Sequence, residues 1–231
     1  MDAAAGGADS GAVLIVGAGP RLGAAIARRL SGGNRTVGLI GRSADSVSRL
    51  ATSLDADGIP AFGAAADVAD AAALTAAIRD LAHRTGPFAV AVHNVSVWRE
   101  GGAGVLTADE LLADLAAGAA SLVTIVNAVL PGMVAGGGGT ILATGSGAAD
   151  HPTPGAPSLA VQKAALRILT RGLAAELAPR GVHVATVTVT GGLDTPGFAV
   201  ADIAAVYADL VVETAGPRER WRTVVEFAGT R

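Results

Sequence analysis

Short runs of aliphatic residues alternate along this chain with longer, alanine-rich amphipathic stretches. The short runs are apolar throughout, which is typical of strands in a sheet that helices cover on both faces. Strand–helix alternation of this kind predicts βαβ units and a parallel sheet. We therefore expect an α/β fold with a doubly wound parallel sheet and helices on both faces. The expected strands are residues 12–16, 36–40, 61–65, 89–93, 140–144, 182–189 and 223–227, and the expected helices are 22–31, 43–56, 70–85, 108–134, 158–177 and 200–212.

Length and composition favour one domain with an aliphatic core. Of the 231 residues, 51% are hydrophobic and 16% are charged, which excludes intrinsic disorder. Aromatic residues make up only 3%, so Ala, Val, Leu and Ile must form the core. No linker divides the chain, and we expect residues 1–11 to be a flexible N-terminus and residues 12–231 to be a single domain.

Charge and cysteine content exclude several classes of function. The formal net charge of −3 gives no support for nucleic-acid binding. The absence of cysteine excludes disulfides, thiolate catalysis and cysteine-ligated zinc, and we expect no metal site. The first residues lack the apolar core of a signal peptide, and no apolar run approaches the roughly 20 residues of a membrane span. We therefore expect a soluble, cytoplasmic protein with no membrane partner.

A glycine-rich turn follows the first expected strand and precedes the first expected helix. In this position glycines let the chain turn tightly and let a pyrophosphate approach the backbone, while the helix N-terminus supplies free N–H groups. The alternative is an ordinary strand–helix turn without a ligand. The candidate cofactor-binding residues here are Gly17, Gly19, Arg21, Leu22 and Gly23.

The end of the second expected strand indicates which dinucleotide is bound. A site for an unphosphorylated adenosine ribose usually has an acidic residue there. This chain has Arg42 and Ser43 instead. A guanidinium pairs well with a 2′-phosphate, so the sequence favours NADP(H) over NAD(H). The alternative is an arginine at a solvated helix start.

These features, in this order, resemble the short-chain dehydrogenase/reductase family over residues 12–227. The glycine-rich turn matches the family's TGxxxGxG signature, with Val16 for Thr and Arg21 for the middle Gly, as in a subset that reads GAGPGxG. The resemblance implies a Rossmann-type fold. It also implies further cofactor contacts at Asp67, Val68, Asn94, Gly191, Leu193 and Thr195.

The resemblance breaks at the catalytic positions. The family uses Ser, Tyr and Lys, with an Asn from the fourth helix: Tyr exchanges the proton, Lys binds the ribose and lowers the pKa of Tyr, and Ser holds the substrate oxygen. Here Lys163 and Ser146 match the family. Leu159 stands in place of Tyr, and Gly118 stands where the Asn belongs.

Three interpretations follow from the missing tyrosine. The chain is an atypical NADPH-dependent oxidoreductase whose proton comes from His151, water or the substrate; or a non-catalytic scaffold or partner subunit; or a non-redox cyclase, dehydratase or isomerase. An inert scaffold has no need for Lys163, Thr195, Asn94 and the phosphate turn together. Their joint presence favours the oxidoreductase, acting on a carbonyl or related unsaturated small molecule.

Segments that border the substrate cleft in the family supply the remaining candidates. Trp98 and Arg99 are expected to contact an anionic, planar substrate, and Phe198 to line the same cleft. Tyr207 offers a phenol but is more simply read as a helix-face residue. The family commonly pairs through its long helices, so the resemblance implies a homodimer or homotetramer, or pairing with a related subunit.

Overall fold

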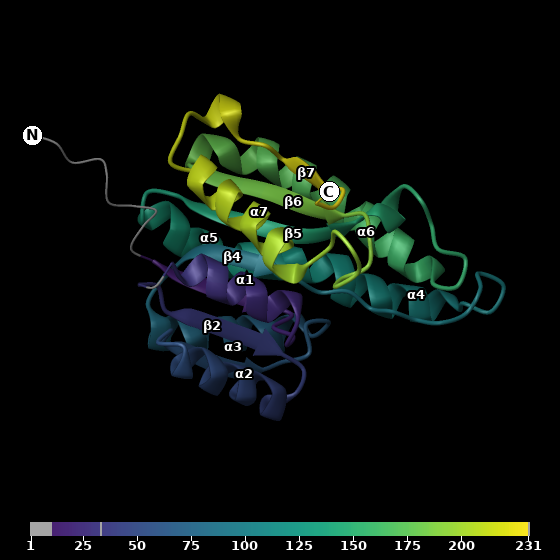
Figure 1. The fold of residues 1–231 in the computed structure, drawn as a ribbon, viewed down its shortest axis with the longest axis horizontal. Coiled ribbons are helices and arrows are strands. Elements are labelled where there is room, and N and C mark those ends of the chain that lie inside the picture. The colour runs from purple at the N-terminus through teal and green to yellow at the C-terminus, as the bar shows by residue number, and fades with distance from the viewer. Residues whose placement is uncertain (1–10, 33, 231) are drawn as a thin grey trace, which may run out of the picture.

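The structure is a computed structural model that describes residues 11–32 and 34–230. The expected flexible N-terminus therefore lies outside the described residues, apart from Gly11. Seven parallel strands form one sheet in the order β3-β2-β1-β4-β5-β6-β7 (Figure 1). The expected strands are confirmed, and no end moves by more than two residues. The strands are β1 (Ala12–Val16), β2 (Val37–Gly41), β3 (Ala61–Ala65), β4 (Phe88–His93), β5 (Gly139–Ser146), β6 (Val182–Val189) and β7 (Val224–Phe227).

Helices cover both faces of the sheet, as the apolar strands predicted. Helices α1, α2 and α7 pack on one face, and α3, α5 and α6 pack on the other. Within β1, Val13 and Ile15 face the first layer while Leu14 and Val16 face the second, and all four are fully buried. The helices are α1 (Leu22–Ser31), α2 (Ala44–Ala56), α3 (Ala71–Thr85), α4 (Ala108–Leu115), α5 (Ser121–Ala135), α6 (Pro157–Leu177) and α7 (Val200–Glu213).

The helix expected over residues 108–134 is continuous but irregular. A π-helical turn, η1 (Ala116–Ala120), joins α4 to α5. Helix α4 begins with a reciprocal capping box, in which the Thr107 side chain accepts from the Glu110 amide and Glu110 returns the bond. Single π turns occur often at functional sites, and this one lies against α6.

The same helical segment shows that the expectation of no apolar stretch as long as a membrane span was wrong. Within the described residues, Ala108–Ala135 is the one helix long and apolar enough, by length and composition, to cross a membrane. Its residues Leu122, Ile125, Val126 and Val129 are buried in the core of the domain. A helix that passes this test can also be a core helix, and 44% of the apolar window of Ala108–Ala135 is buried inside the domain.

Candidate active site

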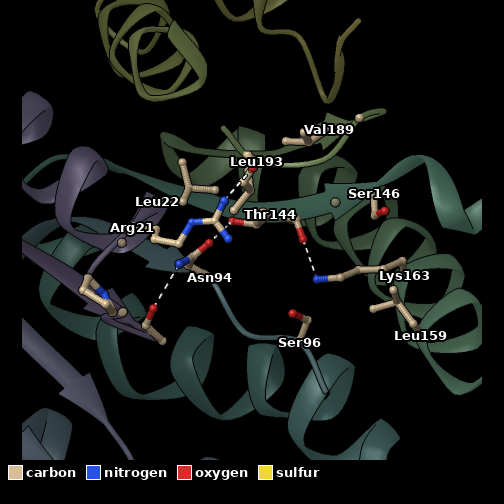
Figure 2. Close-up of a pocket in the computed structure, with 16 residues that line it drawn as sticks. Arg21, Leu22, Asn94, Ser96, Thr144, Ser146, Leu159, Lys163, Val189 and Leu193 are labelled. Atoms are coloured by element: carbon tan, nitrogen blue, oxygen red, sulfur yellow. Dashed lines mark hydrogen bonds between the residues drawn. The ribbon is translucent and has the colours of Figure 1, made fainter. Parts of the chain in front are cut away.

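A cleft of about 390 Å³ opens at the carboxyl ends of β1, β4 and β5. Strand order reverses between β1 and β4, and ligands of open α/β sheets bind at such switch points. The cleft brings together ten of the predicted site residues. These are Gly17, Gly19, Arg21, Leu22, Gly23, Asn94, Ser146, Lys163, Gly191 and Leu193, and the other lining residues are Pro20, Ser96, Thr144, Gly145, Leu159 and Val189 (Figure 2).

The glycine-rich turn holds one end of the cleft. Gly17 has a φ of +85°, and a Cβ there would lie 2.3 Å from the carbonyl oxygen of Asn94. A Cβ on Gly19 would meet nothing within 4 Å, so this position borders open space. No side chain caps the start of α1, which leaves first-turn N–H groups for a ligand. The turn is thus shaped to accept an anion at a helix N-terminus.

Asn94 connects the ends of three strands. Its Nδ2 donates to the carbonyl of Gly17 at 2.9 Å, and its Oδ1 accepts from the hydroxyl of Thr144 at 2.8 Å. The Thr144 hydroxyl also lies 2.7 Å from the phenol of Tyr207, which is fully buried on α7. Burial raises the pKa of Tyr207 above its usual value. Tyr207 is the chain's one tyrosine, and it is not among the residues that line the cleft. Its phenol is therefore part of a buried hydrogen-bond network with Thr144 and Asn94.

Lys163 reaches into the cleft from α6. Its side chain is 3% exposed, and Nζ donates to the carbonyls of Val95 at 2.9 Å and Thr144 at 2.8 Å. Burial lowers the pKa of Lys163 to about 8. Leu159 lies one helical turn earlier and lines the cleft beside it (Figure 2). The lysine therefore has an apolar neighbour at the place where the family resemblance led us to look for a phenol.

Ser146 lies at the end of β5 and turns partly toward the backbone. Its hydroxyl accepts from the Ala148 amide at 3.2 Å and caps the short turn η2 (Gly147–Ala149). Ser96, which the sequence analysis did not single out, lines the cleft on the segment after β4. Each serine thus presents a hydroxyl to the same cavity.

Comparison with known families identifies the family to which the chain belongs. A family model described as short chain dehydrogenase matches residues 11–202. The chain belongs to the short-chain dehydrogenase family. The resemblance noted from the sequence is thereby confirmed at the level of the family.

Individual relatives of this short-chain dehydrogenase are distant in sequence. The chain is 31% identical to "Dehydrogenase/reductase SDR family member 4" of Sus scrofa over 74% of its own length and only 62% of that protein's length. It is 32% identical to a subunit of a (2S)-[(R)-hydroxy(phenyl)methyl]succinyl-CoA dehydrogenase of Thauera aromatica, over 79% of this chain and 72% of that one. A metagenomic short-chain oxidoreductase solved in complex with NADP is 26% identical, with a TM-score of 0.84, 97% of this chain covered and 100% of the other.

Gln162 explains the glycine at position 118 of this short-chain dehydrogenase. A Cβ on Gly118 would lie 2.1 Å from Oε1 of Gln162. The Gln162 amide, fully buried, accepts from the Val97 amide at 3.0 Å and donates to the Val97 carbonyl at 3.1 Å. Gln162 therefore takes the space beside η1 and clamps the segment after β4. The sequence signal was a polar side chain next to Lys163, which alone did not distinguish it from an exposed helix residue.

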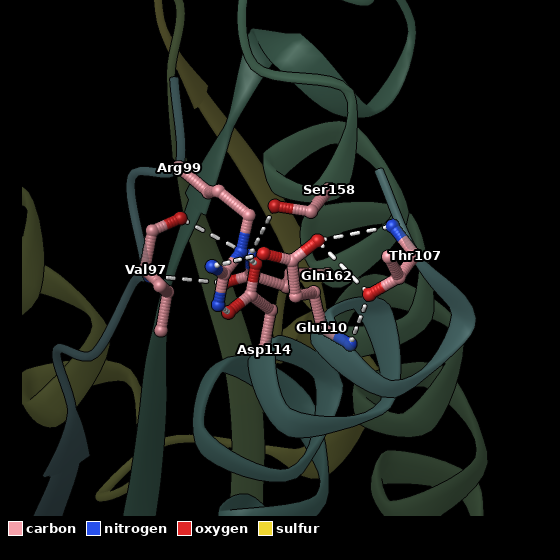
Figure 3. A network of polar contacts seen from close by, with 7 residues as sticks. All are labelled: Val97, Arg99, Thr107, Glu110, Asp114, Ser158 and Gln162. Carbon is pink, nitrogen blue, oxygen red and sulfur yellow. Dashed lines mark hydrogen bonds and ion pairs between the residues drawn. The ribbon is translucent and has the colours of Figure 1, made fainter. Parts of the chain in front are cut away.

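Arg99 is engaged in a structural network, which corrects its predicted contact with substrate. Its guanidinium forms a bidentate pair with Asp114 at 2.8 and 2.9 Å and reaches Glu110 at 3.1 Å (Figure 3). The Asp114 side chain is 3% exposed, and hydrogen bonds from Arg99 and then Ser158 hold the pKa of its carboxyl below the usual range. The network ties the segment after β4 to α4 and the start of α6.

Two further predicted substrate residues and the predicted proton donor lie outside the residues that line the cleft. Phe198 is partly buried and packs edge-on against Phe227, with 5.7 Å between the ring centroids. A Cβ on Gly191 would lie 2.4 Å from the Phe198 ring. Trp98 is 59% exposed. His151 is an exposed loop residue, and neither it nor Trp98 contributes to the cleft wall.

The predicted adenosine-end residues also stand apart from this cleft. Arg42 is exposed and has no side-chain partner among the described residues, while Ser43 caps α2 by accepting from the Ser46 amide. Asp67 is exposed and accepts from the Ala69 amide at 3.0 Å, and Val68 is buried. Thr195 donates to the carbonyl of Gly192 at 2.7 Å. Their roles toward a cofactor stay predictions.

Proposed function

We propose that this short-chain dehydrogenase is an NADP(H)-dependent oxidoreductase that acts on a carbonyl or related unsaturated small molecule. The observation that carries the proposal is the position of Lys163, which lies with Asn94 in the same cleft as the glycine-rich turn. A nicotinamide dinucleotide needs an anion cradle at one end and polar groups for a ribose further along, and this cleft offers both in one cavity.

The residues present fit the cofactor. Open space at Gly19 and the uncapped start of α1 suit a pyrophosphate. When bound, the nicotinamide supplies a hydride. The solved relative in complex with NADP supports the choice of NADP(H), and the exposed Arg42 after β2 supports recognition of a 2′-phosphate.

The active site we propose is atypical because Leu159 has no exchangeable proton. In this proposal Ser146 holds the substrate oxygen, and Lys163 lies beside the ribose. A positioned general acid contributes about 10²–10⁴-fold to a rate, so the source of the proton decides how active the enzyme is. Exposed apolar side chains on α4 and α6, Leu112, Val161 and Ile168, support a homo-oligomer built on these helices. We also propose a cytoplasmic location.

One alternative has a specific observation in its favour. The relative of Thauera aromatica is named as a subunit of a dehydrogenase. Together with Leu159, this supports a role as a non-catalytic partner subunit. In that case the chain is expected to gain activity only when mixed with a second, catalytic chain.

Titration of the purified protein with NADPH and NADH, followed by nucleotide fluorescence, tests the proposal. We expect NADPH to bind at least tenfold more tightly than NADH. Arg42→Ala should remove that preference, because a bidentate contact to the 2′-phosphate is lost. Arg79→Ala, at an exposed arginine on α3, is the matched control and should leave both affinities unchanged. No binding of either nucleotide at millimolar concentration would refute the oxidoreductase.

A further inference from the structure

Lys163 differs from every other basic residue in the chain. Of the 17 residues that are Lys or Arg, sixteen are arginine, and Lys163 is the one lysine. A guanidinium stays protonated at all ordinary pH values, whereas an ammonium releases its proton when it is desolvated. The chain's one ammonium side chain thus lies at the cleft.

The hydrogen bonds of Lys163 fix which proton it can exchange. An ammonium has three N–H donors, and here two of them are held by the carbonyls of Val95 and Thr144. Both carbonyls only accept hydrogen bonds, so neither can supply a proton to the lysine. The third position on Nζ is therefore the one that carries either a proton or a lone pair, and Figure 2 shows Nζ directed into the cleft. Gain and loss of a proton therefore take place on the side of Nζ that faces the cleft.

Other groups near Lys163 do not titrate across the range in which it does. His93 on β4 is fully buried, and burial and then the charge of Lys163 lower its pKa to about 3. Tyr207 on α7 stays protonated because its pKa is raised. Arg21 keeps its charge and pairs with Asp194, and the Asp114 carboxylate near the start of α6 pairs with Arg99. Between about pH 6 and 10, Lys163 is the cleft-lining group among the described residues that changes its charge.

We propose that Lys163 itself is the proton donor for carbonyl reduction, in place of the missing tyrosine. This inference rests on the proposed function. The carbonyl carbon gains a hydride from the bound dinucleotide, the C=O π pair moves to oxygen, and oxygen takes the proton from Nζ to give an alcohol. The oxidised dinucleotide and a neutral amine remain, and water returns a proton to the amine. The pKa of about 8 supports this role because the lysine is mostly protonated at pH 7 yet releases its proton readily.

The single lysine makes a direct test possible without any substrate. Protein grown with ¹³C-labelled lysine gives one side-chain resonance, whose titration in the free protein we expect near pH 8. A titration near pH 10.5, the usual value, would overturn the inference, because such an ammonium holds its proton too tightly. This measurement does not depend on cofactor binding or turnover.

Kinetics test the role itself. With NADPH and a panel of small aldehydes and ketones, we expect the reduction rate to be constant below the pKa of Lys163 and to fall tenfold per pH unit above it. Lys163→Arg keeps the cation and should still bind NADPH within about threefold, but reduction at pH 7 should fall 10²–10⁴-fold. His151→Gln tests the rival proton donor, and we expect it to leave the rate unchanged. His83→Gln, at an exposed histidine on α3, is the control.

The outcomes separate the two proposals. Absence of turnover by the wild-type protein refutes the oxidoreductase and this inference with it. Turnover with a flat pH profile, or reduction that survives in Lys163→Arg, overturns the inference alone. Loss of activity in His151→Gln would transfer the proton-donor role to that histidine and would also overturn the inference.

Discussion

The two ends of the cleft differ in whether backbone or side chains determine their structure. At the end formed by the β1–α1 turn, backbone shape matters most: glycines, a positive φ and an uncapped helix leave room and N–H groups for a ligand. At the end formed by α6 and η1, side chains decide the arrangement. There Gln162 and Asp114 are buried, and they form hydrogen bonds with Val97 and Arg99, respectively.

The difference separates what the chain shares with its family from what it has changed. The turn keeps the first and last glycines of the family signature, Gly17 and Gly23. The α6 end has Leu159 and Gly118 where the family resemblance implies polar catalytic groups. Polar side chains have not vanished from this end. Gln162, Asp114 and Arg99 form hydrogen bonds there that tie the segment after β4 to α4 and α6 (Figure 3).

The largest effect is expected from a methyl group on Gly17. Gly17→Ala forces an alanine to a φ of +85° and puts its Cβ 2.3 Å from a backbone oxygen that cannot move aside. We expect the free energy of unfolding to fall by about 3 kcal/mol, from strain and overpacking together. Chemical denaturation of the free protein measures this change.

Gly19→Ala is the matched variant at the same turn. Its Cβ meets no atom within 4 Å, so stability should change by less than about 0.5 kcal/mol. NADPH should nevertheless bind at least tenfold more weakly, because the methyl group occupies the space of the pyrophosphate. Equal stability losses in the two variants would break the proposed division of roles between these glycines.

The fold was predictable because hydrophobic patterning is a local signal. Each strand is an uninterrupted apolar run, and the sheet buries both of its faces, so strand positions follow from residue type alone. The π turn at Ala116–Ala120 was not predictable in this way. This turn contains Gly118, and Gln162, more than forty positions away in the sequence, occupies the place of a Cβ on Gly118.

The same distinction explains the results at the site. Motif spacing was enough to bring Gly17, Asn94 and Lys163 to one cleft. It could not show that the Arg99 guanidinium is held by Asp114, because a sequence does not reveal which carboxylate lies within reach of a long side chain. Predictions for backbone-dependent residues therefore held better than predictions for long, mobile side chains.

The second effect in size concerns the α6 end. Gly118→Asn would displace Gln162 from Val97 and leave a buried peptide unpaired, at a cost of about 2 kcal/mol in unfolding free energy. Gln162→Ala should cost about the same. The double variant should be at least 1 kcal/mol more stable than the sum of the single effects predicts, because both changes break the same contact. Gly172→Asn, at a position on α6 with open space, is the control. If the two losses of unfolding free energy simply add in the double variant, Gly118 and Gln162 are not in contact.

The smallest effect should come from the ion pair across the cleft mouth. Arg21 donates to Asp194 at 2.8 Å and to the carbonyl of Leu193 at 2.5 Å, but the two charged side chains are 55% and 48% exposed. Solvent screens such a pair, so Arg21→Ala and Asp194→Ala should each change the free energy of unfolding by less than about 1 kcal/mol, with a coupling that shrinks as salt is added. NADPH affinity at 150 mM salt should change less than it does in Gly19→Ala. A larger loss in Arg21→Ala would mean that charge, and not backbone shape, governs the turn end of the cleft.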